Sequence, residues 1–188
     1  MKQLTGDELF SNDGMVLDYD VSDFWRWYAS NILHGALRGA IAEFIVAKAL
    51  DQPCIKRQSW DAYDLDYKGI KIEVKSSAYL QEDNADRYSR ISFNIAKHSH
   101  WNEDERWNVD ARRHSDVYVF CLFAEKNREN ANPLQIEQWQ FFVLPTSTLD
   151  EQCGDRQTLS LSALLSLSPI QCTYSDLQST IDALSLNG

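Results

Sequence analysis

Three charged side chains around a short turn have the types and spacing that phosphoester chemistry needs. Asp64 lies ahead of a Lys-Gly dipeptide, and Glu73 and Lys75 follow it in the stretch IKIEVK. If the dipeptide is the two-residue turn of a β-hairpin, Asp64 is directly opposed to Glu73. Opposed Cβ atoms lie about 4.5–5.5 Å apart, where like charges destabilise a sheet. We therefore expect an interaction that holds these two carboxylates together.

Strand alternation places Lys75 on the same face as Glu73, one pleat further along the strand. Hard divalent cations such as Mg²⁺ bind oxygen ligands, usually one or two carboxylates together with waters and a substrate phosphate. A nearby lysine can orient the attacking water or stabilise the charged transition state. Two carboxylates and one ammonium group in this arrangement suit phosphodiester hydrolysis.

An amphipathic helix is predicted ahead of the hairpin. Residues 22–50 carry apolar side chains at helical spacing, with Ser22 placed as the N-cap and a break near Asn31 or Gly35. The second half of this helix has a row of small residues with one large member, Glu43; the small ones are Ala36, Ala40 and Ala47. Small side chains let a helix lie close to a sheet, so Glu43 should lie near the sheet.

Further segments complete a mixed sheet. Residues 116–124 form a continuous apolar run typical of a buried central strand, residues 139–144 suit its neighbour, and residues 91–96 alternate in polarity. Residues 158–169 are rich in serine and leucine and predict a short strand or helix. Ser175 and Gln178 are three residues apart, the spacing of a capping box, which predicts a C-terminal helix. The expected fold class is mixed α/β (α+β), with a central mixed sheet flanked by helices.

Length and composition suggest one domain. The 188 residues are 44% apolar, so residues 1–188 can bury a full core, which we place at about 22–144 with an αβ cap at about 145–188. The four cysteines form no CxxC pair, so reduced structural thiols are expected. Without a basic and apolar leader or an apolar run of about 18 residues, the sequence predicts a cytoplasmic protein with no membrane segment.

These motifs resemble the core of the PD-(D/E)xK nuclease superfamily, the restriction-endonuclease-like fold. The resemblance rests on Asp64, on the triplet Glu-Val-Lys that follows after eight intervening residues, and on the preceding helix with the sequence RGAIAEF. Tyr63 stands where the proline that names the motif would be. The resemblance implies an αβββαβ core and dependence on Mg²⁺ or Mn²⁺. It also implies Asp64 and Glu73 as metal ligands, Lys75 as the catalytic lysine and Glu43 as an additional acidic residue.

The net charge of −10 excludes a protein that coats nucleic acid, so any contact with phosphates must be local. The best candidate patch is residues 87–114, whose cations are Arg87, Arg90, Lys97, Arg106, Arg112 and Arg113. Its histidines, His98, His100 and His114, are more typical of surface or packing positions than of catalysis. Trp101 and Trp107 either stack on bases or pack in the core, and the second is favoured.

The sequence thus predicts a metal-dependent nuclease that acts on DNA. Two alternatives stay open: a non-catalytic module of the same fold that binds nucleic acid or protein, and an RNase on the same scaffold. Asp61 and Asp66 are interpreted as turn or paired surface acids, and Asp116 as a strand-end acid. The oligomeric state is not fixed by the sequence, which leaves room for a homodimer.

Overall fold

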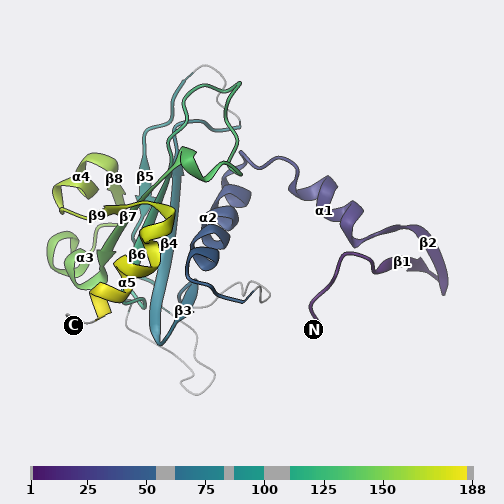
Figure 1. Ribbon diagram of the computed structural model, residues 1–188, viewed down its shortest axis with the longest axis horizontal. Coiled ribbons are helices and arrows are strands. Elements are labelled where there is room, and N and C mark those ends of the chain that lie inside the picture. The colour runs from purple at the N-terminus through teal and green to yellow at the C-terminus, as the bar shows by residue number, and fades with distance from the viewer. Residues whose placement is uncertain (1, 54–61, 83–86, 100–110, 186–188) are drawn as a thin grey trace.

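A five-stranded mixed sheet forms the centre of the computed structural model, which describes residues 2–53, 62–82, 87–99 and 111–185 (Figure 1). In spatial order its strands are β3 (Leu65–Tyr67), β4 (Ile70–Ala78), β6 (Val117–Phe123), β7 (Trp139–Pro145) and β9 (Ile170–Cys172). β4 and β6 are parallel, and the other neighbours are antiparallel. The predicted class, mixed α/β with a central mixed sheet, is confirmed.

The middle strand, β6, is buried along its whole length. Both of its faces are covered, so its sequence is continuously apolar and shows no alternation. β7 pairs with it from end to end in antiparallel register. These two strands confirm the predicted central strand and its predicted neighbour.

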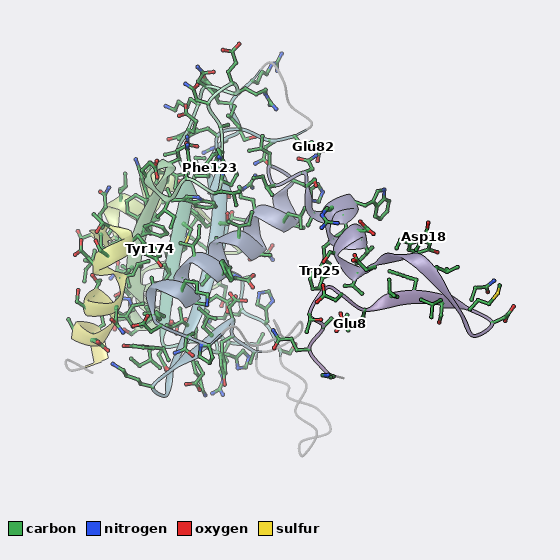
Figure 2. The ribbon with its side chains drawn as sticks, turned by 45° about the vertical axis from the view of Figure 1, so that its right-hand side comes forward. Glu8, Asp18, Trp25, Glu82, Phe123 and Tyr174 are labelled. Atoms are coloured by element: carbon green, nitrogen blue, oxygen red, sulfur yellow. The ribbon has the colours of Figure 1, made fainter. Side chains whose placement is uncertain are left out.

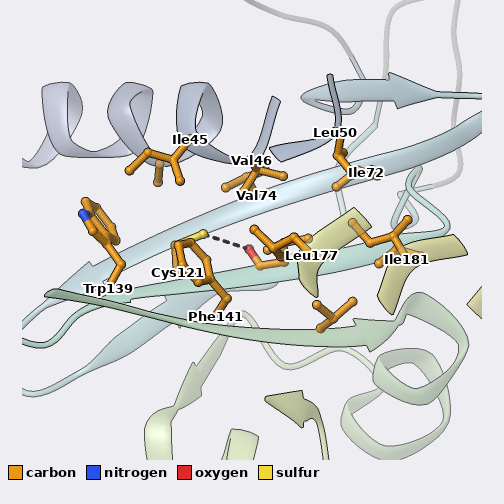
Figure 3. Close-up of a cluster of buried hydrophobic side chains, with 14 of the residues drawn as sticks. Ile45, Val46, Leu50, Ile72, Val74, Cys121, Trp139, Phe141, Leu177 and Ile181 are labelled. Atoms are coloured by element: carbon orange, nitrogen blue, oxygen red, sulfur yellow. Dashed lines mark hydrogen bonds between the residues drawn. The ribbon is translucent and has the colours of Figure 1, made fainter. Parts of the chain in front are cut away.

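One face of the sheet packs against helices α2 (Gly35–Ala49) and α5 (Leu177–Ser185). Figure 3 shows Ile45 of α2 above the sheet, close to Val74 of β4, with Leu177 of α5 filling the same layer. Full burial of one such side chain stabilises a fold by about 1.5–3 kcal/mol. This layer fixes α2 against β4, the two elements that carry the candidate site.

The other face is covered by a small two-stranded sheet and two short helices. These elements are β5 (Ser92–Asn94), β8 (Thr158–Ser160), α3 (Thr146–Cys153) and α4 (Leu161–Ser166). The expected alternation of residues 91–96 is present, and Phe93 packs edge-on against Phe120 of the central sheet with ring centroids 5.1 Å apart. β5 nevertheless pairs with β8 and does not join the central sheet. Residues 158–169 form both a strand and a helix, in that order.

The predicted hairpin between β3 and β4 is confirmed. Lys68 and Gly69 both have positive φ, 52° and 84°, as the central pair of a type I′ turn requires. The register pairs Tyr67 with Ile70 and continues two residue pairs further, to Leu65 and Ile72. Asp66 also caps the turn, because its Oδ1 accepts from the Gly69 N–H at 2.9 Å.

Two predicted helix starts are wrong. The first helix, α1 (Val21–Ala29), is capped by Asp20, whose side chain accepts from the Asp23 N–H while the Asp23 carboxylate accepts from the Asp20 N–H. This reciprocal pair outcompetes Ser22, whose hydroxyl donates instead to the Gly6 carbonyl. Ser175 lies inside the 3₁₀ turn η2 (Tyr174–Asp176), and α5 begins after it. The predicted break in the first helix does occur, between α1 and α2.

Residues 2–29 form an arm that extends away from the rest of the chain (Figure 1). It consists of the ribbon β1 (Leu9–Asn12) and β2 (Met15–Asp20) followed by α1, and α1 has no buried residue. Trp27 is 80% exposed. In Figure 2 the labelled Trp25 and Asp18 belong to this arm, and Glu82 lies where the arm meets the sheet. We call residues 2–29 the arm and the remainder the body.

Among the described residues, no helix is long and apolar enough to cross a membrane. In the same part of the chain, Cys121, Cys153 and Cys172 are free thiols, as expected. β9 and α5 belong to the segment expected as a cap, and both are built into the central sheet and its core. A second 3₁₀ turn, η1 (Ile136–Gln138), leads into β7.

Candidate functional site

The four predicted site residues lie on three neighbouring elements. Asp64 immediately precedes β3, Glu73 and Lys75 lie in the middle of β4, and Glu43 lies on α2. The regular pairing of β3 and β4 ends at Leu65, and the Asp64 N–H donates to the Ile72 carbonyl at 3.0 Å. The chain therefore leaves the ladder at Asp64, and the Asp64 side chain is placed by a different contact from the cross-strand pairing that the sequence predicts.

That contact is a hydrogen bond to the backbone of β4. β4 continues beyond the three residue pairs that it makes with β3. The Val74 N–H, which points toward the β3 side, therefore has no backbone acceptor in β3. The Asp64 Oδ2 accepts from the Val74 N–H at 2.8 Å. A carboxylate that replaces a strand in this way is held at the edge of the sheet, directly beside the Glu-Val-Lys triplet.

The Asp64 carboxyl is strongly perturbed. Its pKa is raised from 3.8 to about 7. Burial is the largest cause, followed by the negative charges of Glu73 and then Glu43. The Val74 N–H and the Lys75 ammonium lower it, but less. A buried carboxyl whose pKa is raised to near neutrality, with other carboxylates close to it, is a common feature of functional sites.

Glu73 and Lys75 form an ion pair on the face of β4 that is covered by β5 and β8. The Lys75 Nζ donates to the Glu73 Oε1, and the two side chains are 22% and 15% exposed, in that order. The neighbouring strand places Tyr118 beside Glu73. Burial, and then the charge of Glu73, raises the pKa of the Tyr118 hydroxyl. Lys75 is thus a half-buried cation that neutralises only one of the carboxylates near it.

Glu43 is half-buried on α2. Its negative charge raises the pKa of Asp64. The pKa of the Cys121 thiol is raised mainly by burial, then by Cys172 and Asp64, and least by Glu43. Cys121 lies on the sheet face that α2 covers. The face of α2 that is buried against the sheet carries Arg38, Ala42, Ile45 and Val46. In the predicted row of small residues Ala36 is exposed and Ala40, Glu43 and Ala47 are only partly buried, so this row flanks the contact with the sheet and does not form it.

The donor set fits a hard divalent ion in its chemistry. Asp64 and Glu73 provide carboxylate oxygens at one sheet edge, and the repulsion between them is the condition that a cation relieves. In the part of the chain that the structure describes, no three His, Cys, Asp or Glu side chains are grouped closely enough to hold a metal. An ion at this place would have at most two carboxylate ligands, and water or substrate oxygens would have to complete its coordination.

The sequence did not single out Arg38, a buried cation on α2. Its Nη1 donates to the Leu33 carbonyl and to the Gln81 Oε1, each at 3.2 Å, and burial lowers its pKa. Arg38 is 5% exposed, and its Nε has no hydrogen-bond partner among the described residues. The only signal in the sequence is an arginine inside an otherwise small and apolar helix face.

The predicted basic patch is only partly a surface. The side chain of Arg113 is completely buried and serves the interior. His98 and Arg112 pair through their backbones, and the His114 ring contacts the His98 carbonyl, so these histidines serve local structure. Asp116 accepts from the Lys71 N–H at 2.8 Å, as expected of a strand-end acid. Outside the described residues lie Asp61, His100, Trp101, Arg106 and Trp107.

The chain matches no protein-family model, no curated protein and no solved structure. The functional argument therefore depends on the geometry and electrostatics of the site.

Proposed function

We propose that this protein is a metal-dependent nuclease of the PD-(D/E)xK type, with the restriction-endonuclease-like αβββαβ core, that hydrolyses phosphodiester bonds in DNA. The observation that carries the proposal is the raised pKa of Asp64, held by the Val74 N–H among Glu73, Glu43 and Lys75. A hairpin that only needed a stable edge would gain from replacing one of these carboxylates with a neutral side chain.

Asp64 and Glu73 would hold Mg²⁺ or Mn²⁺. A bound divalent ion supplies charge stabilisation at the phosphate and lowers the pKa of a bound water. The chain's own contribution is to fix its carboxylates in advance, since Asp64 is anchored to the Val74 N–H and Glu73 to Lys75. Preorganised charges cost no rearrangement during the reaction.

Lys75 has the role of a cation beside the reacting phosphate. It lies on the same strand face as Glu73 and is 22% exposed, which leaves the ammonium reachable from solvent. From there it can orient an attacking water or stabilise the negative charge that develops on the phosphate oxygens. Glu43 is proposed as an additional acid that acts on Asp64.

The element order is compatible with the proposed core. α2, β3, β4 and β5 follow one another as a helix and three strands, and β6 adds the next strand of the central sheet. Two features differ from a simple αβββαβ arrangement: β5 pairs outside the central sheet, and the described residues between β5 and β6 contain no helix. The proposal therefore depends on the site rather than on the topology.

The experiment that tests it is incubation of plasmid, single-stranded DNA and RNA with Mg²⁺ or Mn²⁺, with EDTA as the metal-free control. We expect cleavage of DNA by the wild-type protein and a loss of at least about a hundredfold in Lys75→Ala, the size of effect seen when one charge-stabilising group is removed. Lys71→Ala is the matched control, because Lys71 is exposed on the same strand face. Cleavage that survives in Lys75→Ala would contradict the assignment.

A second pair of variants distinguishes the roles of Asp64 and Asp66. Asp64→Asn should abolish cleavage, whereas Asp66→Asn, which removes a charge but keeps an acceptor for the Gly69 N–H, should leave most of it. Activity on RNA alone would favour the RNase alternative. Binding of nucleic acid or protein without cleavage under either metal would favour the non-catalytic module.

A further inference from the structure

Beyond the carboxylates, an aromatic and cationic group lies just past the end of β4. The Lys126 Nζ is 4.4 Å from the ring centroid of Tyr79 and 5.9 Å from that of Tyr88. The two rings are 6.4 Å apart and nearly perpendicular, at 74°. Cation and ring contacts of this kind hold three side chains in one fixed arrangement. We call these three residues the tyrosine platform.

Its two rings are placed differently. Tyr79 packs against the hydrophobic cluster on the sheet face that β5 and β8 cover, whereas Tyr88 is 61% exposed. The Ser89 N–H donates to the Tyr79 carbonyl at 2.7 Å and so ties the segment that carries Tyr88 to the strand. An exposed aromatic ring that is already ordered loses little conformational freedom when a flat ligand stacks on it.

Arginines lie close to the exposed ring in the sequence, and so do the acids Glu82, Asp83 and Asp86. Arg87 and Arg90 flank Tyr88 in the chain and are both exposed. Arg128 is held nearby, because its Nη2 donates to the Gln81 carbonyl at 2.7 Å. The carboxylate of Glu125, next to Lys126, already accepts from the Lys126 and Asn127 N–H groups, at 2.8 and 2.6 Å.

The platform lies within a few nucleotides of the candidate site. Tyr79 follows Lys75 by four residues, which at about 3.3 Å per residue is about 13 Å along the strand. A nucleic-acid strand advances about 3.4 Å per nucleotide in a duplex, so about four nucleotides or fewer would span this distance. Ser77, between them, accepts from the Ser92 N–H, so the path must run beside β5.

From this arrangement we infer that the tyrosine platform binds an unpaired nucleobase stacked on Tyr88, with the adjacent phosphate contacted by Lys126. The protein would therefore select single-stranded nucleic acid, or single-stranded segments of it. A base in a duplex has its faces covered by its neighbours, whereas every unpaired base offers a face to an aromatic ring. The inference rests on the proposed function for the link to cleavage, but the binding itself does not require it.

The test measures binding in the Lys75→Ala background, so that cleavage does not interfere. The probe is a fluorescein-labelled oligothymidylate, followed by fluorescence anisotropy. Tyr88→Ala should weaken binding about fivefold or more, and Tyr88→Phe should bind as the parent does, because stacking needs the ring and not the hydroxyl. Lys126→Gln should weaken binding and reduce the salt dependence by about one phosphate contact.

Tyr28→Ala is the matched control. Tyr28 is 57% exposed, nearly as much as Tyr88, but it lies on the arm and stacks on Phe24. This substitution should leave the affinity unchanged. Melting curves of all variants verify that each one is folded.

Three comparisons between ligands show which feature of the nucleic acid is bound. DNA and RNA single strands of matched sequence show which sugar is preferred, and a strand with abasic positions should bind the parent and Tyr88→Ala equally. A duplex should bind weakly and without dependence on Tyr88. Equal loss of duplex and single-strand binding in Tyr88→Ala, or no loss at all, would overturn the inference.

The outcomes separate the two proposals. DNA cleavage by the wild-type protein combined with binding that ignores Tyr88 would overturn the platform and leave the nuclease. Binding that depends on Tyr88 without any cleavage would support the platform and count against the nuclease.

Discussion

Two of the places where the body holds charged side chains away from water do so in opposite ways. One is centred on Arg113, whose side chain is completely buried, and the other on Asp64. Both lie beside strands of the central sheet, and both take their partners from remote parts of the chain. The comparison shows which buried charges serve the fold and which serve a further purpose.

Arg113 is held by several acceptors. Its Nε donates to the Ile95 carbonyl at 2.9 Å, its Nη1 pairs with Asp150, and its Nη2 donates to the carbonyls of Gly154, at 3.0 Å, and Arg156, at 3.4 Å. A buried cation paired in this manner pins three loops together. Its charge is paired with Asp150, and four of its five N–H donors have acceptors within the fold.

Asp64 has the opposite environment. The charges near it include two of the same sign, Glu73 and Glu43, and the cation Lys75, which is already paired with Glu73. The ionised form of Asp64 therefore destabilises the fold at this point. A buried charge that is paired indicates a structural role, whereas a buried group of like charges indicates a binding site.

The largest effect on stability is expected at the paired charge. Arg113→Met should lower the free energy of unfolding by about 3–5 kcal/mol, because it strands Asp150 and three carbonyls. Chemical denaturation measures the change. Arg112→Met, at the exposed neighbouring position, should stay within about 0.5 kcal/mol of wild type. Equal stability of the two variants would show that the buried guanidinium is dispensable.

The next largest effect has the opposite sign. In metal-free protein at pH 8, Asp64→Asn should raise the free energy of unfolding, by at most about 4 kcal/mol for a shift of the pKa from 3.8 to about 7. Asparagine keeps an acceptor for the Val74 N–H while it removes the repulsion. Asp66→Asn should not stabilise. A destabilised Asp64→Asn would identify Asp64 as an ordinary structural acid.

The pH dependence follows from the same shift. Between about pH 4 and pH 7 the folded protein keeps a proton on Asp64 that the unfolded chain has lost, so the stability of the wild type should fall as the pH rises through this window and level off above it. Asp64→Asn lacks this contribution. The difference in melting temperature between the two proteins in EDTA, followed from pH 4 to pH 8, checks the sign.

The smallest expected effect is that of the metal. An ion that binds only the folded state stabilises it by about 1.4 kcal/mol at ten times its Kd. For a chain of this size that is a rise in melting temperature of about 3–6 °C. Millimolar Mg²⁺ or Mn²⁺ should produce this rise in the wild type and in Arg112→Met, and not in Asp64→Asn. An unchanged rise in Asp64→Asn would remove Asp64 from the ligand set.

The sequence predicts best where the determinants are local. The hairpin register follows from Lys68 and Gly69 and from alternation alone, and the central position of β6 follows from its continuous apolar run. The start of α1 failed although it is local, because Asp20 and Ser22 both qualify as caps and only the reciprocal bond with Asp23 decides between them.

Prediction fails where the partner is remote in the chain. Alternation in β5 reveals its buried face but not that it pairs with β8. From the sequence, Arg113 is interpreted as part of a basic surface, because its acceptor Asp150 is 37 residues away in the chain. At the site, the residues were predicted, but the bond from the Val74 N–H to Asp64 was not, because it depends on where β3 ends.

The arm has a consequence for optical measurements of the body. Trp27 on α1 is 80% exposed, whereas Trp139 at the start of β7 is 5% exposed. An indole that is already in water emits at the wavelength of the unfolded state, so Trp27 contributes a constant, red-shifted background. The blue-shifted emission of Trp139, beside Phe123 in the core, is a part of the spectrum that changes when the body unfolds.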